Sequence, residues 1–318
     1  MNKLKLSYLL ILSFIVHQSS VAQEQEKIAN EQLKNYEWAM RGLLSTILGD
    51  TSKVSRINAS EELKKTLEKA FKEKGAFQYP FKQAKGLSII SPDDGAFRIF
   101  TWQLYLDENN YQYMGYLQMP DEKFYKLEDK SAEMRSPQYS QLRPEKWYGA
   151  LYYSVKSFKD EKRQTKYLVF GYDAYDFFRR RKVLDVLHFF RGQPRFGDKV
   201  IEMKDHRGTV RNVYRFVMEY SASVSVSMNY SHGKEMVIYD HLVYQMIPGQ
   251  GPSNVPDGSY CGLELKKGKW KIVDKVYKHN PYVGNDNPPL EHPILDKDKN
   301  KSKDIIGRTK RKGKIKID

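Results

Sequence analysis

The sequence predicts a mainly β protein, α+β overall, in which N-terminal helices are followed by an antiparallel β meander and a flexible basic C-terminal tail. Three observations predict it. Apolar residues recur at helical spacing near the N-terminus, short runs of Tyr, Phe, Val and Ile separated by turn residues follow Pro80, and the lysine-rich end has few large apolar residues. Strands joined by short turns pair as antiparallel neighbours, so the β part could form a sandwich, a barrel or a propeller-like sheet.

Residues 1–22 have the pattern of a secretory signal peptide. Lys3 and Lys5 precede an apolar run from Tyr8 to Val16, and the small residues of Ser20-Val21-Ala22 come just before Gln23. The apolar run is much shorter than the roughly 20 residues that cross a bilayer. We therefore expect cleavage after Ala22 and an exported protein that is not transmembrane, located in the periplasm, on the outer-membrane surface or outside the cell.

Residues 23–80 are expected to form a helical segment with two helices. Ser60 is the predicted N-cap of the second helix, and Gly75 is its predicted end. Each helix has one apolar stripe, which should pack against another element. These stripes consist of Tyr36, Met40, Leu43, Leu44 and Ile47 in the first helix, between Glu24 and Leu48, and of Leu63, Leu67 and Phe71 in the second.

Residues 81–280 are expected to form the antiparallel β domain. Between Val210 and Tyr230 bulky side chains occupy nearly every even position, which predicts strand structure with one buried face and one exposed face. A single strand of this length would be unusually long, so we expect a break near Ser221. His232-Gly233 is predicted to be a two-residue hairpin loop that leads into a strand from Met236 to Met246.

Arg179, Arg180 and Arg181 form the most conspicuous charged cluster of the β domain. Strands are predicted at Tyr167 to Tyr172 and at Val183 to Phe190, so the three arginines should lie in the connection between them. At such a corner the guanidinium groups can remain hydrated. The alternative is an anion site, because fixed positive charges beside aromatic rings could hold a phosphate, a sulfate or a sugar acid.

No metal site, cofactor motif or nucleophile motif is recognised. The serine elbow, the phosphate loop, the zinc-helix motif and the dinucleotide fingerprint are absent from the sequence. "DKDKNKSKD" imitates a calcium loop but has Lys301 and Gly307 where that loop needs glycine and glutamate. Cys261, the only cysteine, is expected to pack within a strand. The sequence therefore predicts neither a metal nor a cofactor.

An acid/base pair would have to assemble between strands. Asp185 and His188 are three residues apart, and Asp240 and His241 are adjacent, so in a strand each pair points to opposite faces. Pairing of these groups across neighbouring strands remains possible, and it would indicate a hydrolase.

Residues 281–318 are expected to form a disordered basic tail. Lys297 to Asp318 contains ten lysines and arginines against three aspartates. Lys310, Arg311 and Lys312 are its most concentrated candidate binding residues. Such a tail could bind polyanions or only keep the chain soluble. Because export makes nucleic acid an implausible partner, we expect anionic envelope polysaccharide or lipid headgroups instead.

The segments "YLVFGYDAYDFFRRRKVLDVLHF", "RFVMEYSASVSVSMNYS", "MVIYDHLVY" and "PDGSYCGLELKKGKW" resemble exported proteins of Gram-negative bacteria of the Bacteroidetes type. The resemblance covers about Tyr167 to Val276 and implies export. The group has no assigned activity, so the resemblance assigns no catalytic residue.

These observations favour a non-catalytic envelope or periplasmic protein with a binding or structural role, whose partner is anionic or a carbohydrate. The competing hypothesis is the hydrolase with an acid/base pair assembled across strands. The sequence leaves the ligand and the oligomeric state open.

Overall fold

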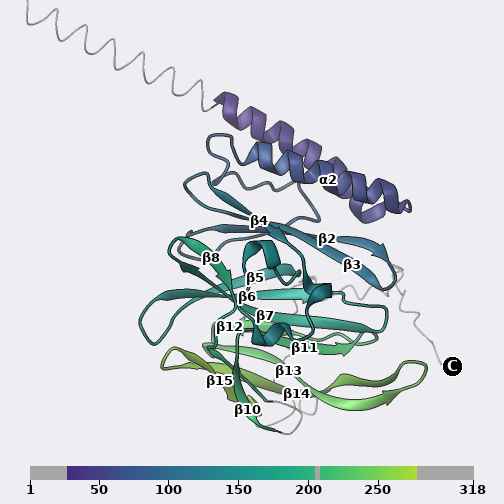
Figure 1. Cartoon of the computed structure of the whole chain (residues 1–318), viewed down its shortest axis with the longest axis vertical. Coiled ribbons are helices and arrows are strands. Elements are labelled where there is room, and N and C mark those ends of the chain that lie inside the picture. The colour runs from purple at the N-terminus through teal and green to yellow at the C-terminus, as the bar shows by residue number, and fades with distance from the viewer. Residues whose placement is uncertain (1–26, 205–207, 278–318) are drawn as a thin grey trace, which may run out of the picture. The chain divides into compact units, whose positions relative to one another are not determined.

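The computed structural model describes residues 27–204 and 208–277, in which two α-helices and three predominantly antiparallel sheets form a mainly β fold without a closed barrel (Figure 1). The chain divides into two compact units, residues 1–276 and 277–318. The predicted signal peptide and basic tail, including Lys310, Arg311 and Lys312, lie outside the described residues.

The first described helix covers residues 27–49, and α2 covers Lys53–Ala70. The predicted start of the second helix was wrong. Ser52 caps α2, and its side chain accepts a hydrogen bond from the backbone N–H of Ser55. Ser60 lies buried inside the helix, where its hydroxyl accepts a hydrogen bond from the indole of Trp102.

Three short 3-10 helices lie between Ser131 and Lys146. The remaining elements are strands in three sheets. The first sheet has the order β1-β2-β3-β4, the central sheet β11-β7-β6-β5 with β8 beside β7, and the third sheet β10-β9-β15-β14-β13-β12. The first sheet contains β1 (Ser88–Ile90), β2 (Arg98–Asp107), β3 (Asn110–Gln118) and β4 (Phe124–Glu128). The central sheet contains β5 (Leu151–Lys159), β6 (Thr165–Asp173), β7 (Arg179–Phe190), β8 (Gln193–Phe196) and β11 (Phe216–Ser221). The third sheet contains β9 (Ile201–Lys204), β10 (Val210–Val213), β12 (Met228–Ser231), β13 (Met236–Ile247), β14 (Gly251–Lys266) and β15 (Lys269–Val273).

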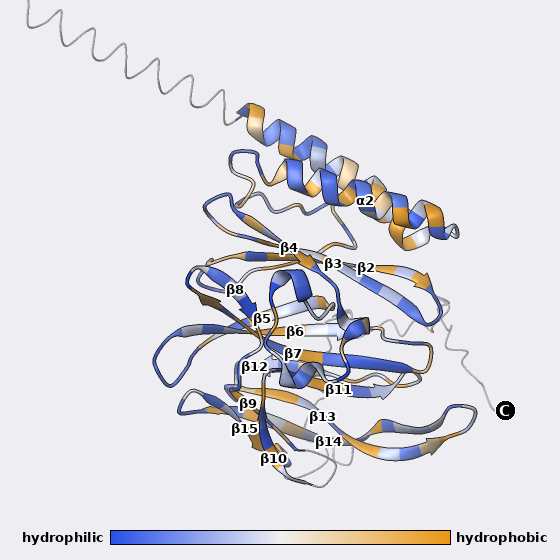
Figure 2. Cartoon of the chain, viewed as in Figure 1, coloured by the Kyte–Doolittle hydropathy of each residue, from blue (hydrophilic) through white to orange (hydrophobic). Residues whose placement is uncertain are grey.

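The helices and the three sheets stack as successive layers with three hydrophobic cores between them. The first core joins the helices to the first sheet, the second joins the first sheet to the central sheet, and the third joins the central sheet to the third sheet. Trp102, Trp147 and Trp270 each lie in a different core, in that order. Figure 2 shows hydrophobic and hydrophilic residues interspersed along the helices and most strands, as expected for elements with distinct faces.

The central sheet is buried on both faces. In β7, Val183 and Leu187 face the second core, whereas Leu184 and Val186 face the third. This double burial explains the nearly continuous apolar run in its sequence. Cys261, expected to pack within a strand, is buried in β14.

The long even-position pattern is divided between two sheets. Residues 210–213 form β10 in the third sheet, residues 216–221 form β11 in the central sheet, and residues 228–231 form β12, again in the third sheet. The expected break after Ser221 is confirmed. A second break at Tyr214-Arg215 was not expected. The even positions predicted to be buried are exposed in β10, where Val210 is exposed and Val213 is buried.

The prediction of a two-residue hairpin loop at His232-Gly233 was wrong. The β12–β13 connection is a four-residue loop, because Ser231 pairs with Met236, and the positive φ of 52° occurs at Glu235 rather than at Gly233. One contact between strands that are far apart in the chain is parallel: β15 meets β9 through Trp270 and Ile201.

Candidate functional site

The arginine triplet belongs to a strand and not to the connection predicted for it. β7 begins at Arg179, so the β6–β7 loop contains only residues 174–178. Backbone pairing with Glu219, Tyr220 and Ser221 of β11 extends the strand through the arginines. Strand alternation then sends Arg179 and Arg181 to one face and Arg180 to the other.

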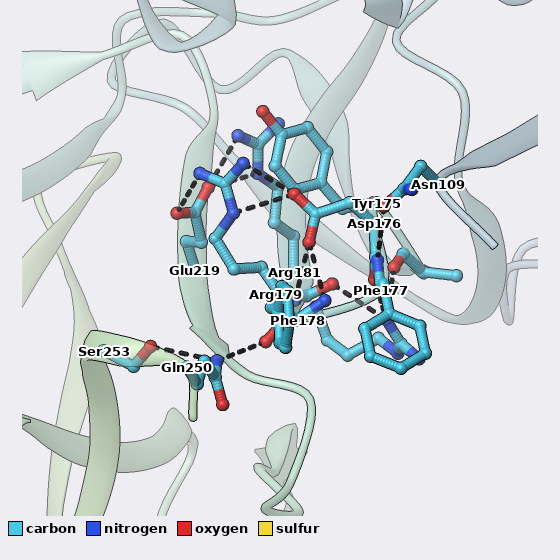
Figure 3. A network of polar contacts seen from close by, with 12 residues as sticks. Asn109, Tyr175, Asp176, Phe177, Phe178, Arg179, Arg181, Glu219, Gln250 and Ser253 are labelled. Atoms are coloured by element: carbon cyan, nitrogen blue, oxygen red, sulfur yellow. Dashed lines mark hydrogen bonds and ion pairs between the residues drawn. The ribbon is translucent and has the colours of Figure 1, made fainter. Parts of the chain in front are cut away.

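Arg179 and Arg181 are held by acidic side chains (Figure 3). The Arg179 guanidinium donates to the Asp176 carboxylate at 2.6 and 2.8 Å and to Glu219 at 3.2 Å. Arg181 donates to the second oxygen of Glu219 at 2.6 and 2.9 Å. Both guanidinium carbons lie over the ring of Tyr175, at 4.7 and 3.3 Å from its centre. These contacts fix the shape of the corner.

A buried carboxyl lies behind this cluster. Asp173 accepts a hydrogen bond from Tyr148, whose hydroxyl also accepts one from Arg181. Burial raises the pKa of Asp173 above its usual value, although the hydrogen bonds from Tyr148 and the Tyr175 N–H act in the opposite direction. For Arg181, burial lowers the pKa, but Tyr148 and Glu219 outweigh it and the pKa is raised. Arg181 therefore stays charged at any physiological pH.

Arg180 is bound differently. Its guanidinium donates to the backbone carbonyls of Ala174, Asp176 and Arg179. Within the described ranges it has no ion pair with a carboxylate. Arg180 is therefore the least compensated arginine of the triplet.

Connections from all three sheets meet at this corner. The N–H of Phe177 donates to Asn109 in the β2–β3 turn, and Gln250 in the β13–β14 turn donates to the carbonyl of Phe178, as Figure 3 shows. Gln250 also accepts a hydrogen bond from Ser221 at the end of β11. We call the surface formed by residues 108–109, 174–181 and 248–250 the three-loop surface.

The three-loop surface exposes large apolar side chains. Phe177 and Phe178 are 51% and 46% exposed, and Tyr105 is exposed at the end of β2. Tyr244 and Met246, near the end of β13, are the most exposed large hydrophobic residues of the described chain. An arginine without a carboxylate partner thus lies beside exposed aromatic rings, a combination suited to binding and costly to display without a partner.

Comparisons with protein-family models, curated proteins and solved structures found no match. The assignment of function therefore depends on the geometry alone.

The four acid/base candidates do not come together. Asp185 is fully buried and forms an ion pair with Arg215, and Asp240 accepts a hydrogen bond from the Ser227 N–H. His188 lies 3.4 Å from the Gln141 amide. His241 forms the one cross-strand pair, with Asp257 of β14 at 2.9 Å, and both side chains are partly exposed. Asp257 had not been singled out, because a β-bulge at His241 sets this register.

Metal ligands and membrane-spanning helices were also sought among the described residues. No cluster of three or more His, Cys, Asp or Glu side chains in the described ranges is arranged to hold a metal ion. None of the described helices is long and apolar enough to cross a bilayer.

The sequence identified the three arginines but not their partners. Glu219 lies 38 residues beyond Arg181, and only the pairing of β11 with β7 brings them together. One signal was available: Glu219 is the only acidic residue among the apolar residues and serines of Phe216–Ser221. An isolated acid in a strand of the β domain is a reasonable counter-ion for a neighbouring arginine run.

Proposed function

We propose that this chain is an exported, non-catalytic binding protein that attaches to an acidic polysaccharide through the three-loop surface. The observation that carries the proposal is the exposure of Phe177 and Phe178 in the loop whose carbonyls bind Arg180, an arginine with no carboxylate partner in the described chain. Aromatic rings offer apolar faces on which sugar rings can stack. A guanidinium group supplies a charged donor for a sugar carboxylate.

The supporting contacts favour a preorganised surface. Asn109, Gln250 and Asp176 hold the backbone of the β6–β7 loop from three sides, so the exposed rings are displayed by a fixed main chain. A binder that is already ordered loses less conformational entropy on association. The proposal therefore requires no rearrangement of the sheets.

Charge and shape favour a polysaccharide over a lipid surface. Arg179 and Arg181 are already paired with acids, which leaves Arg180 as the one arginine of the triplet without a carboxylate partner in the described ranges. Vesicle binding by electrostatics alone usually requires clusters of several lysines or arginines. The tail residues Lys310, Arg311 and Lys312 could supply such a cluster, and they are proposed as an auxiliary polyanion contact.

Affinity electrophoresis in gels containing polygalacturonate tests the proposal. Residues 23–318 should be retarded at about physiological ionic strength, and dextran, a neutral polymer, should retard them less. The double variant Phe177→Ala/Phe178→Ala and the single variant Arg180→Gln should each weaken binding by about tenfold or more, equivalent to about 1.4 kcal/mol.

The other end of β7 offers matched controls. Phe190 is 56% exposed with Arg191 over its ring, so Phe190→Ala and Arg191→Gln remove the same groups at a different place. These variants should bind like the wild type. Equal losses at both ends of β7, or retention only by anionic phosphatidylglycerol vesicles, would refute the proposed site.

Export and the tail are tested separately. Expression of the full chain in a Gram-negative host should yield a protein outside the cytoplasm whose N-terminal residue is Gln23. Deletion of residues 297–318 should weaken polyanion binding and reduce its salt dependence. If envelope extracts capture the protein equally well after this deletion, the tail does not contribute to binding.

The hydrolase hypothesis has one supporting observation, the pair between His241 and Asp257. A carboxylate that orients an imidazole is part of many acid/base sites. Assays with chromogenic esters and glycosides, using His241→Ala as the control, test it. Turnover lost in His241→Ala would favour the enzyme over the binding protein.

A further inference from the structure

A pocket of about 360 Å³ lies between the central and third sheets, at the end of β13 that is farther from the three-loop surface. Its residues come from β5, the β12–β13 hairpin and the β14–β15 hairpin. The pocket lies at the start of β13, whereas the three-loop surface lies at its end. Its volume is within the range of small-molecule sites. We call it the hairpin pocket.

Aromatic rings line the hairpin pocket. Trp270 is almost completely buried and packs edge-on against Phe158 and Tyr230, with ring centres 5.5 and 6.3 Å away. Tyr230 is only half-buried, so it presents part of its side chain to the pocket. This arrangement fixes an aromatic wall at the pocket without needing a ligand to order it.

Two of the four charged side chains that line the pocket, Lys156 and Glu264, have partners of opposite sign. The Lys156 amine lies 3.7 Å from Asp93 and 5.0 Å from the centre of the Tyr230 ring. The Glu264 carboxylate lies 2.7 Å from Lys266. A charged ligand would have to compete with these pairs. A neutral ligand with hydroxyl groups can instead accept from the ammonium and donate to the carboxylate.

We propose that the hairpin pocket binds a single neutral sugar ring. A sugar combines an apolar face for the Tyr230 ring with hydroxyls that both donate and accept, and these match the mixed charges of Lys156 and Glu264. This inference does not depend on the three-loop surface. The two sites lie at opposite ends of β13, so either can fail while the other stands.

Tryptophan fluorescence of residues 23–318, titrated with glucose and N-acetylglucosamine, tests the proposal. At least one of these sugars should change the emission with saturation in the millimolar range, as expected for a single ring. Glucuronate and glycine, which are anionic and zwitterionic, should bind at least tenfold more weakly. Trp270→Phe should remove the optical change, because the other three tryptophans lie elsewhere.

Calorimetry with the sugar that responds identifies the site. Tyr230→Ala should lower the affinity at least tenfold, whereas Tyr139→Ala, which removes an exposed tyrosine that does not line the pocket, should leave it unchanged. Circular dichroism and thermal unfolding show whether each variant is folded. If Tyr230→Ala does not fold, Glu264→Ala and Lys156→Met replace it, and each should weaken binding.

Three outcomes overturn the proposal. The first is the absence of a response to either neutral sugar up to about 100 mM, which is far above the Kd of usual single-ring sites. The second is equal sugar binding by Tyr230→Ala and the wild type. The third is tighter binding of glucuronate or glycine than of the neutral sugars. Loss of polygalacturonate binding in Phe177→Ala/Phe178→Ala with intact sugar binding would separate the two sites.

Discussion

Arg215 is the side chain on which the central region of the fold depends most. It is fully buried, and its guanidinium pairs with Asp185 at 2.9 Å and donates to the carbonyls of Pro137, Ser140 and Phe196. These contacts join the central sheet to the segment of short 3-10 helices. Arg215 thus neutralises the buried Asp185 carboxylate and links it to three backbone carbonyls of other segments.

Replacing Arg215 by Met should lower the free energy of unfolding by about 3–5 kcal/mol, because Asp185 would become a buried charge without a partner. Urea unfolding at neutral pH measures the loss. Lys65→Met, which breaks an exposed ion pair with Glu62, should change the free energy of unfolding by about 0.5 kcal/mol or less. A loss for Arg215→Met as small as for this control would contradict the buried role.

His188 should make stability depend on pH. Burial lowers its pKa in the folded state, Asp198 acts in the opposite direction, and the positive charge of Lys166 lowers the pKa further. The unfolded state then binds more protons, so the stabilising effect is fully present above the unfolded pKa of about 6.5 and is lost as the pH falls. The difference in unfolding free energy between about pH 7.5 and pH 5 should shrink in His188→Gln. An unchanged difference would show that other groups cause it.

At the level of elements, Asp129 holds together the end of β4, strand β3 and the chain entering β5. Its carboxylate accepts hydrogen bonds from the backbone N–H groups of Tyr113, Ser131 and Gly149 at 2.9 to 3.2 Å. Gly149 approaches the carboxylate so closely that a Cβ atom would overlap it. The glycine is therefore required by space.

Gly149→Ala should destabilise the protein by about 1–3 kcal/mol, since Asp129 must move and release its donors. Gly233→Ala is the matched control, because a Cβ atom at Gly233 has no neighbour within 4 Å and its φ is not positive. The control should change the free energy of unfolding by less than about 0.5 kcal/mol. Thermal or urea unfolding of both variants measures the two changes in stability. Equal changes would contradict the steric argument.

Local sequence patterns predicted many elements but not their sheets. β6 and β7 were expected from Tyr167–Tyr172 and Val183–Phe190, and the mainly β class is confirmed. The pattern through residues 210–230 could not reveal that β10 and β12 join one sheet and β11 another, because periodicity reports faces and not neighbours. The partners of the arginine triplet were missed for the same reason.

At the level of the whole molecule, each of the three cores contains one buried tryptophan. Adjacent cores share a sheet, so loss of the first or central sheet removes one wall from two cores. This arrangement couples the layers energetically. The sequence could suggest a sandwich, but it could not show three sheets, since stacking depends on contacts far apart in the chain.

Three variants each retain one tryptophan, Trp102, Trp147 or Trp270, with the other tryptophans replaced by Phe. After correction for their different stabilities, the three variants should unfold in urea with coincident midpoints. The shared sheets make the transition cooperative. Tryptophan emission of each variant, compared with its far-ultraviolet circular dichroism, measures the coincidence. An earlier transition reported by Trp102 alone would show that the helices and the first sheet unfold independently.

The passage of the chain from the third sheet into the central sheet and back also constrains the order of folding. β11 completes the central sheet only after β9 and β10 have been synthesised, while β15 enters the middle of the third sheet from the far end of the chain. A nascent polypeptide that ends before residue 273 can assemble its helices and first sheet but leaves β9 separated from β14. Such a chain would carry an unfinished strand edge, so premature termination would favour aggregation.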